Sequence, residues 1–90
     1  MIKERVITII KSSGLKNPEL EERTGINRYT WQNIRNKPGR ELKTEEMEAV
    51  IKLFPEYAFW IASGNIAPEI GQTSPDYDEV NAKLDKRAEG

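Results

Sequence analysis

The stretch that decides the fold runs from Lys16 to Asn36 and reads KNPELEERTGINRYTWQNIRN. Its apolar residues recur at a spacing that lets two short helices press them into one cluster. These residues are Leu20, Ile26, Trp31 and Ile34. Gly25 lies between the two predicted helices, where its freedom to adopt a left-handed conformation permits a sharp turn. We therefore predict helices at about 18–23 and 27–36, hinged at Gly25.

The second predicted helix turns a polar face outward. Guanidinium, amide and aromatic groups make up this face, from Arg28, Tyr29, Gln32, Asn33, Arg35 and Asn36. No carboxylate occurs from Gly25 through Gly39. Such a surface suits a polyanion that also presents base edges, and the spacing is that of a DNA-reading helix-turn-helix. The alternative is that these cations and amides are ordinary solvated groups.

Charge is distributed unevenly along the chain. Residues 1–43 contain ten Lys and Arg against five Asp and Glu, whereas residues 44–90 contain four against ten. The formal net charge of -1 therefore conceals a basic half that includes the predicted two-helix unit. Attraction to phosphates acts within about 8 to 10 Å, so a basic half can bind nucleic acid although the whole chain is slightly acidic.

Composition excludes several classes of function. The 90 residues predict one small domain with a modest core. The chain has no Cys and no His, which removes disulfides, thiolate metal sites and the commonest metal ligand and general base. Without a phosphate-binding Gly loop or paired catalytic carboxylates, we expect no enzyme activity, no cofactor and no metal.

No apolar run approaches the roughly 18 residues that span a bilayer, and the first residues do not begin a signal peptide. We therefore expect no membrane partner. The expected location is the cytoplasm of a bacterial cell, in association with the nucleoid.

Further helices are expected on either side of the central pair. The apolar spacing from Ile2 to Ile10 favours a helix that stops at 12–14, although the β-branched run is also compatible with a strand. Helices are predicted from Thr44 to Phe54 and from Pro55 to Ala62. Residues 65–74 indicate a loop or extended arm. A thin apolar stripe predicts a short helix at 75–88, which either packs on the domain or on a partner, or frays.

Three polar residues are predicted to cap helices: Asn17 before Pro18, Asn27, and Thr44. The carboxylates that follow Thr44, among them Glu46 and Glu48, are interpreted as surface charge at the helix N-terminus. Trp31 is assigned to the core because it shares a buried stripe with Ile26 and Ile34, rather than to stacking on bases.

On these residues the chain resembles the lambda-repressor-like Cro/C1 helix-turn-helix family. Leu20, the Thr24–Asn27 turn, Trp31 and Ile34 carry the resemblance, which covers about residues 1–63. It implies an all-α fold, a compact five-helix DNA-binding domain at 1–63 with the helix-turn-helix at about 17–36. The acidic segment 64–90 has no counterpart in the shared motif, and we expect it to be a C-terminal arm or short extra helix. The family usually has a small residue where this chain has Glu21, whose carboxylate would meet the close approach of the two helices. The alternative is that Glu21 bends outward and pairs with a neighbouring Arg or Lys.

The resemblance also implies roles for single residues in operator binding as a phage or bacterial transcription regulator. Base-reading positions in the major groove match Arg28, Tyr29, Gln32 and Asn33. For Tyr29 the alternatives are contact with a thymine methyl or a phosphate, or a surface position without a partner. Expected phosphate contacts are Asn17, Thr30, Arg35, Asn36, Lys37, Arg40 and Lys43. Asn17 is also expected to brace the recognition helix.

A single recognition helix reads about four or five base pairs, so we expect a homodimer on a palindromic double-stranded operator. The predicted interface is an aromatic-rich cluster that holds four of the seven aromatic residues of the chain. Its members are Phe54, Tyr57, Phe59, Trp60 and Ile61. The alternative is that this cluster completes the core of the monomer. An alternative function is a protein-interaction module, such as an antitoxin-like or anti-repressor partner, on the same scaffold.

Overall fold

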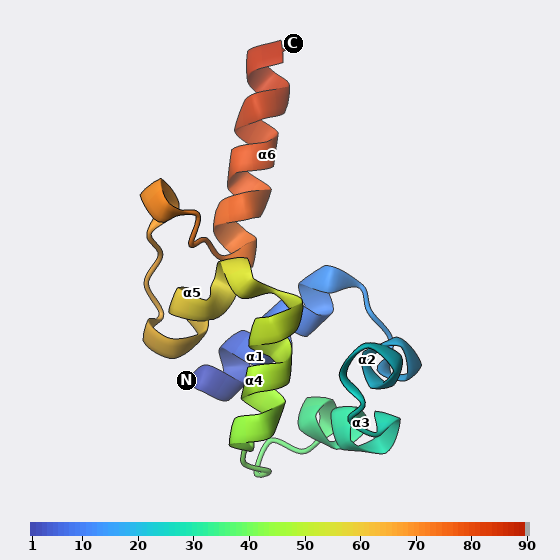
Figure 1. Cartoon of the computed structure of the whole chain (residues 1–90). Coiled ribbons are helices and arrows are strands. Elements are labelled where there is room, and N and C mark those ends of the chain that lie inside the picture. The colour runs from blue at the N-terminus through green and yellow to red at the C-terminus, as the bar shows by residue number, and fades with distance from the viewer. Residues whose placement is uncertain (90) are drawn as a thin grey trace.

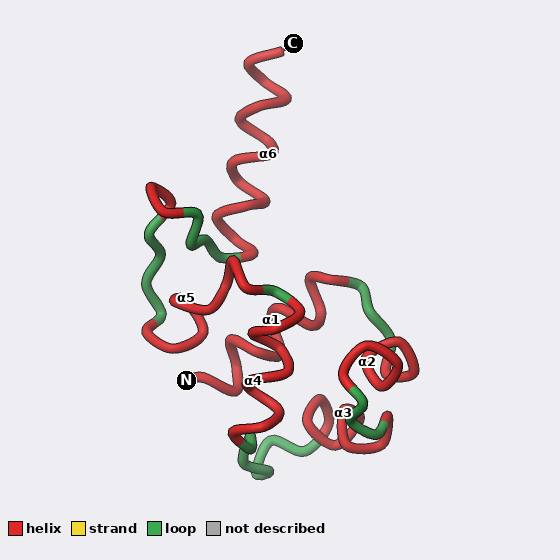
Figure 2. Tube along the Cα trace, in the orientation of Figure 1, coloured by secondary structure: helices red, strands yellow, loops and turns green. Residues whose placement is uncertain are grey.

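The computed structural model describes the backbone of residues 1–89 and the side chains of residues 1–84. Within this part of the chain the structure is all-helical, as predicted (Figures 1 and 2). The α-helices are α1 (Ile2–Ser13), α2 (Asn17–Thr24), α3 (Arg28–Asn36), α4 (Thr44–Leu53), α5 (Ala58–Ser63) and α6 (Pro75–Glu89). Two single 3-10 turns, Pro55–Tyr57 and Pro68–Ile70, precede α5 and α6. No described helix is long and apolar enough to cross a membrane.

The core is formed where α1 to α5 meet. Its fully buried side chains are Val6, Ile9, Ile10, Leu20, Trp31, Ile34, Val50 and Ile61. In α1, Val6, Ile9 and Ile10 are three and four residues apart, which is the spacing of one helix face. The strand alternative for residues 2–13 is therefore wrong, because a strand would turn alternate members of this set away from the core.

The turn between α2 and α3 is built around Gly25 and Thr24. Gly25 has φ 76°, the left-handed conformation that the sequence predicts. The Thr24 hydroxyl donates to the Leu20 carbonyl (2.6 Å) and accepts from the backbone N–H of Ile26 (3.1 Å). It also lies 3.3 Å from Trp31 Nε1, so the buried indole has a polar partner. Trp31 is fully buried, which confirms its assignment to the core.

One of the three predicted caps is confirmed. Asn27 Oδ1 accepts from the backbone N–H of Tyr29 (2.8 Å) at the start of α3. Asn17 and Thr44 are instead the first residues inside α2 and α4. In each of these helices a carboxylate of the first turn accepts from the backbone N–H of the N-cap residue. Glu19 accepts from Lys16 N–H (3.1 Å) and Glu46 accepts from Lys43 N–H (2.9 Å).

Residues 65–74 fold back on the body rather than forming an extended arm. The Gln72 side chain accepts from Phe59 N–H (3.0 Å) and donates to the Pro55 carbonyl (3.1 Å). Thr73 N–H donates to the Glu56 carbonyl (2.9 Å). Beyond this loop α6 leaves the body, and its free end points away from the side that carries α3 (Figure 1). The molecule is consequently elongated, 43 × 25 × 21 Å.

Gly25→Ala should destabilise the protein by about 1 kcal/mol, because a Cβ in the left-handed region is strained even where space is free. A Cβ at Gly25 would meet nothing within 4 Å, so the effect isolates backbone strain. Urea unfolding measures it. Gly39→Ala is the matched control, because that position is equally open and lacks the positive φ. Equal stability of the two variants would contradict the assigned role of Gly25.

Candidate nucleic-acid interface

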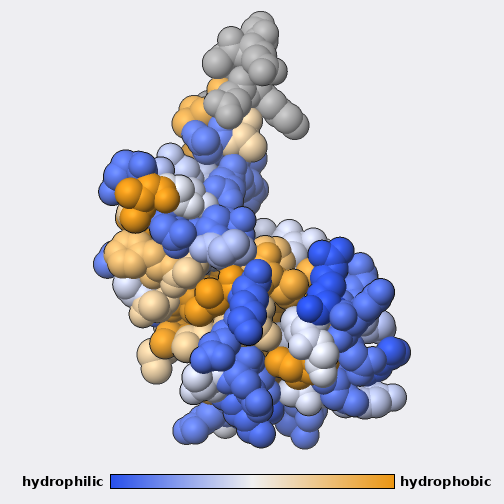
Figure 3. Space-filling view, viewed as in Figure 1, coloured by the Kyte–Doolittle hydropathy of each residue, from blue (hydrophilic) through white to orange (hydrophobic). Residues whose placement is uncertain are grey.

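The outer face of α3 brings the four predicted base-reading residues together. Arg28, Tyr29 and Gln32 are exposed, and Asn33 is half-buried. Tyr29 has 67% of its surface accessible. On the opposite side of the helix Trp31 and Ile34 are fully buried and anchor α3 to the body. The surface over α2 and α3 is predominantly hydrophilic (Figure 3).

Arg28 is paired with Glu21 of α2. The guanidinium donates to Glu21 Oε1 from Nε (3.1 Å) and from Nη2 (3.0 Å), and the Arg28 backbone N–H donates to Oε2 (2.9 Å). These bonds, led by the one from the backbone N–H, lower the pKa of Glu21 below its usual value. Of the two alternatives for Glu21, the structure shows pairing with a neighbouring cation, and the contact between α2 and α3 accommodates a carboxylate.

Arg35 is directed into the protein. Its Nε donates to Asn17 Oδ1 (2.8 Å) and its Nη2 to the Leu15 carbonyl (2.7 Å). Burial lowers the pKa of this guanidinium. Asn17 therefore braces α3, as expected, and it does so through Arg35. Both side chains were predicted to contact phosphate, yet in this structure they tie α3 to the start of α2.

Arg40 likewise has an internal partner. Its Nη1 and Nη2 donate to the two carboxylate oxygens of Glu46, at 2.9 and 2.7 Å. Glu46 is only 2% exposed, so its interpretation as surface charge is wrong. The Arg40 guanidinium is the main reason why the pKa of Glu46 lies below its usual value, although burial opposes the shift. The pair fixes the loop before α4, and Arg40 is less available to phosphate than predicted.

Lys3 is a structural cation that the sequence prediction missed. Its ammonium donates to the carbonyls of Lys37 (2.7 Å), Pro38 (3.3 Å) and Arg40 in the loop after α3. No local pattern marks this role, because the partners are 34 to 37 residues away in sequence. The inward position of Glu46, by contrast, has a sequence signal. Glu46 lies three residues after the N-cap residue Lys43, and a Glu at that position can accept from the N-cap N–H.

The remaining predicted phosphate contacts lie on α3 and on the loop that follows it. Asn36, Lys37 and Lys43 are exposed, and Thr30 is half-buried. With Arg35 and Arg40 held internally, the two lysines are the more accessible cations of this group. In the part of the chain that the structure describes, no cluster of three or more His, Cys, Asp or Glu side chains could hold a metal ion.

The aromatic-rich cluster divides between core and surface. Ile61 is fully buried, so it belongs to the monomer core and not to an interface. Phe54 and Tyr57 stack with ring centroids 6.1 Å apart and, with Trp60, pack against the core as half-buried residues. Phe59 is 43% exposed. Tyr57 also donates to Asp78 Oδ2 (2.7 Å), which ties α6 to the body. Burial, together with Asp78, raises the pKa of the Tyr57 hydroxyl.

The fold and this face define a class: a small all-helical protein in which one short helix, anchored by a buried indole, presents an amide-rich surface. Among solved structures the chain is similar to Pf6r from the filamentous phage Pf6 of Pseudomonas aeruginosa PA01. The two share 37% sequence identity with a TM-score of 0.82, over 92% of this chain and 95% of that chain. The chain therefore belongs to the same family as Pf6r. No family model and no curated protein matches it.

Glu46→Gln should destabilise the protein by about 1–3 kcal/mol, because Arg40 loses the anion that satisfies its half-buried guanidinium. Glu48→Gln, an exposed change on the same helix, should alter stability by less than about 0.5 kcal/mol. Urea unfolding at neutral pH compares the two. If Glu46→Gln were no worse than Glu48→Gln, the ion pair would have no structural role.

The same pair predicts a pH dependence. Because the folded-state pKa of Glu46 lies below the usual 4.5, its contribution is complete above that pH. It is lost as the pH falls through the lowered pKa of the folded state. The stability difference between the wild type and Glu46→Gln should therefore shrink below about pH 4.5, as measured by urea unfolding across pH 3 to 7.

Proposed function

We propose that this chain is a sequence-specific double-stranded DNA-binding protein, a repressor-like transcriptional regulator of the Cro/C1 helix-turn-helix type. The observation that carries the proposal is the outer face of α3. It combines exposed hydrogen-bonding side chains with a rigid, fully buried anchor in Trp31 and Ile34. Amides such as those of Gln32 and Asn33 pair with base edges in the major groove, which admits an α-helix. Binding, rather than catalysis, is the proposed activity.

The surroundings of α3 are consistent with this role. The basic half of the chain includes α1 to α3 and the loop that follows, so phosphates on either side of a groove would meet local positive charge. Asn36, Lys37 and Lys43 are the proposed main phosphate contacts, with Thr30 and Asn17 beside them. Arg35 and Arg40 would hold the helix and the loop in place. Family membership with a protein of a filamentous phage is consistent with a phage regulator.

Selection of bound sequences from a random duplex pool should recover a defined motif. Gln32→Ala should relax preference at one position per half-site, by about 1–3 kcal/mol, because an amide pairs with a particular base edge. Lys37→Ala should weaken binding to all duplexes alike and reduce the slope of log K against log salt by about 1. Fluorescence anisotropy at several salt concentrations measures both effects.

Lys52→Ala is the control for the lysine variant, because Lys52 is an exposed cation at the end of α4, outside the proposed interface. Its affinity and salt slope should equal those of the wild type. Recovery of no motif, or a motif that Gln32→Ala and Asn33→Ala leave unchanged, would overturn the assignment of α3.

We also propose that the chain acts as a homodimer, because one short recognition helix reads too few base pairs to select an operator. With Ile61 in the core, the predicted interface reduces to Phe59 and the outer edges of its half-buried neighbours. Further exposed apolar side chains lie in the same half of the chain: Ile70 (73%), Val80 (56%) and Leu84 (54%). Apolar surface is visible on α6 and on the loop beside it (Figure 3). A second copy that covers this surface is the proposed occupant.

Leu84→Glu should weaken self-association at least tenfold, because the new carboxylate would have to be desolvated in the interface. Ala82→Glu adds the same charge two positions earlier, on roughly the opposite side of α6, and should leave self-association unchanged. Sedimentation equilibrium measures the difference. Operator affinity should fall in parallel with dimer formation. Identical behaviour of the two variants would exclude this face of α6 from the dimer.

The protruding α6 also favours the alternative function, a protein-interaction module in which α6 binds a different protein. A monomeric chain that still needs the Leu84 face to bind such a partner would support this alternative. Retention of specific DNA binding by the same monomer would separate the two activities.

A further inference from the structure

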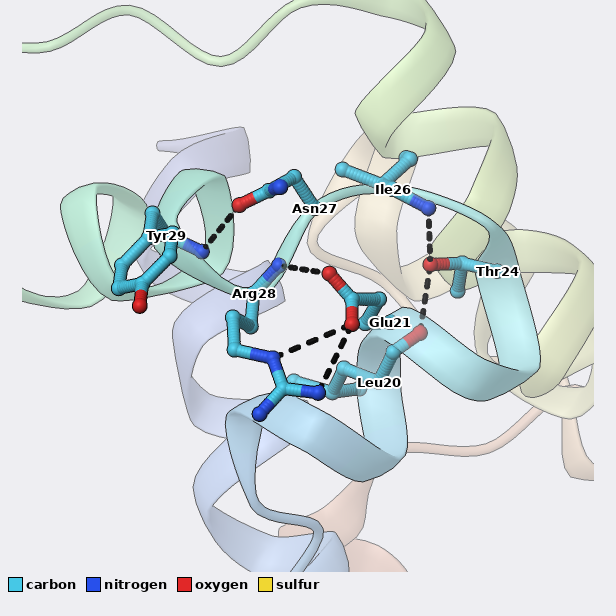
Figure 4. A network of polar contacts seen from close by, with 7 residues as sticks. All are labelled: Leu20, Glu21, Thr24, Ile26, Asn27, Arg28 and Tyr29. Carbon is cyan, nitrogen blue, oxygen red and sulfur yellow. Dashed lines mark hydrogen bonds and ion pairs between the residues drawn. The ribbon is translucent and has the colours of Figure 1, made fainter.

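The ion pair between α2 and α3 uses one side of the Arg28 guanidinium and leaves the other side available. Glu21 Oε1 accepts from Nε and from Nη2, so the carboxylate faces the side-on edge of the group. Nη1 has no part in the contact and points away from Glu21 (Figure 4). The Arg28 side chain is 47% exposed. The end of the guanidinium formed by Nη1 and the second Nη2 hydrogen is therefore free to donate.

This free end has the geometry of a two-pronged donor. Paired acceptors at the distance of guanine O6 and N7 are the usual partners of such an arginine in the major groove. An adenine offers one acceptor and one donor on the same edge and fits poorly. If α3 enters the groove, a guanidinium that is held in place before binding loses less rotamer freedom on contact than a mobile one.

Glu21 is well placed to hold Arg28, because it fixes both the side chain and the backbone. Its second oxygen accepts from the Arg28 backbone N–H at the N-terminus of α3, which prevents the carboxylate from following the guanidinium outward. A small residue at this position, which is usual in the resembled family, would not reach Arg28. A carboxylate at the contact between two helices is costly, and at this position it orients one arginine.

We propose that Glu21 is a positioning residue that presents the end of the Arg28 guanidinium to a guanine of the operator. The inference rests on the proposed DNA binding by α3 and adds to it a base identity and a residue that acts without touching the DNA. Two other roles for the pair make different predictions. A purely structural Glu21 would affect stability alone, whereas a Glu21 that withholds Arg28 from DNA would reduce affinity for the guanine operator.

The test compares the wild type with Arg28→Ala, Glu21→Ala and the double variant. The wild type should select a motif that contains a guanine, and Arg28→Ala should reduce the guanine-to-adenine affinity ratio at that position about tenfold. Glu21→Ala should reduce the ratio at the same position, and at no other, about three- to tenfold. The double variant should lose no more than Arg28→Ala alone, because both changes act through one contact.

Glu22→Ala is the matched control, since Glu22 is the adjacent, exposed carboxylate of α2. Loss of either carboxylate should add the same charge contribution to the affinity for every duplex, and Glu22→Ala should leave the guanine-to-adenine ratio unchanged. Thermal unfolding of each variant verifies that the fold persists. Because the readout is a ratio of two affinities of one variant, a partial loss of folded protein cancels.

The outcomes separate the inference from the proposed function. If the wild type selects no motif, the proposed function fails. If it selects a motif and Glu21→Ala keeps the full guanine preference, the inference is overturned while the function stands. A larger gain in affinity for the guanine operator in Glu21→Ala than in Glu22→Ala, with a raised guanine-to-adenine ratio, would likewise overturn it, because Glu21 would then be withholding Arg28.

Discussion

Burial of the Trp31 indole is the interaction on which the other features of this fold depend. A side chain of this size removes roughly 150–250 Å² from water, which is worth about 4–6 kcal/mol. This is large for a core in which eight apolar side chains of residues 1–84 are fully buried. The indole N–H would be costly to bury alone, and Thr24 supplies its partner through a hydroxyl that also closes the turn at Gly25. Packing and turn geometry are therefore coupled, and α3 is held rigidly with its polar face outward.

The second principle of the structure is that its cations are divided between two tasks. Lys3, Arg35 and Arg40 have partners inside the chain: Lys3 and Arg40 fix the loop after α3, and Arg35 ties α3 to the start of α2. Lys37 and Lys43 remain exposed. Both groups contribute equally to the net charge of the chain. An arginine whose N–H groups already donate to carbonyls and carboxylates mainly holds neighbouring segments in place. A surface that must dock one helix in register benefits from this division, since a mobile helix would blur the readout of bases.

Arg28 lies between these two groups. Its pairing with Glu21 makes it part of the α2–α3 contact, while its other guanidinium edge stays available to solvent. The structure thus contains a side chain that is at once structural and accessible, adjacent to Tyr29 and one helical turn from Gln32. This arrangement is why the proposed specificity depends on a residue of α2 as well as on the outer face of α3.

Much of the fold followed from local patterns. The hinge at Gly25, the cap at Asn27, the buried stripe of α3 and the all-helical class were predictable, because each depends on residues within one or two helical turns of one another. The caps at Asn17 and Thr44 were misassigned, since the carboxylate three residues into each helix competed successfully for the free N–H groups. Glu46 was misread because Glu45, Glu46 and Glu48 were all interpreted as surface charge, although only Glu46 lies three residues after the N-cap residue Lys43.

The sequence by itself determined the helices, the turn and the identity of the polar face, because these are set by periodicity and by the conformational preferences of single residues. Only the tertiary structure decided which charged groups remain free, that Ile61 belongs to the core, and that α6 leaves the body. Those outcomes depend on contacts between residues far apart in the chain, such as Lys3 with the loop after α3 and Tyr57 with Asp78. Electrostatic pairing of this kind depends on distances in space that no sequence spacing encodes.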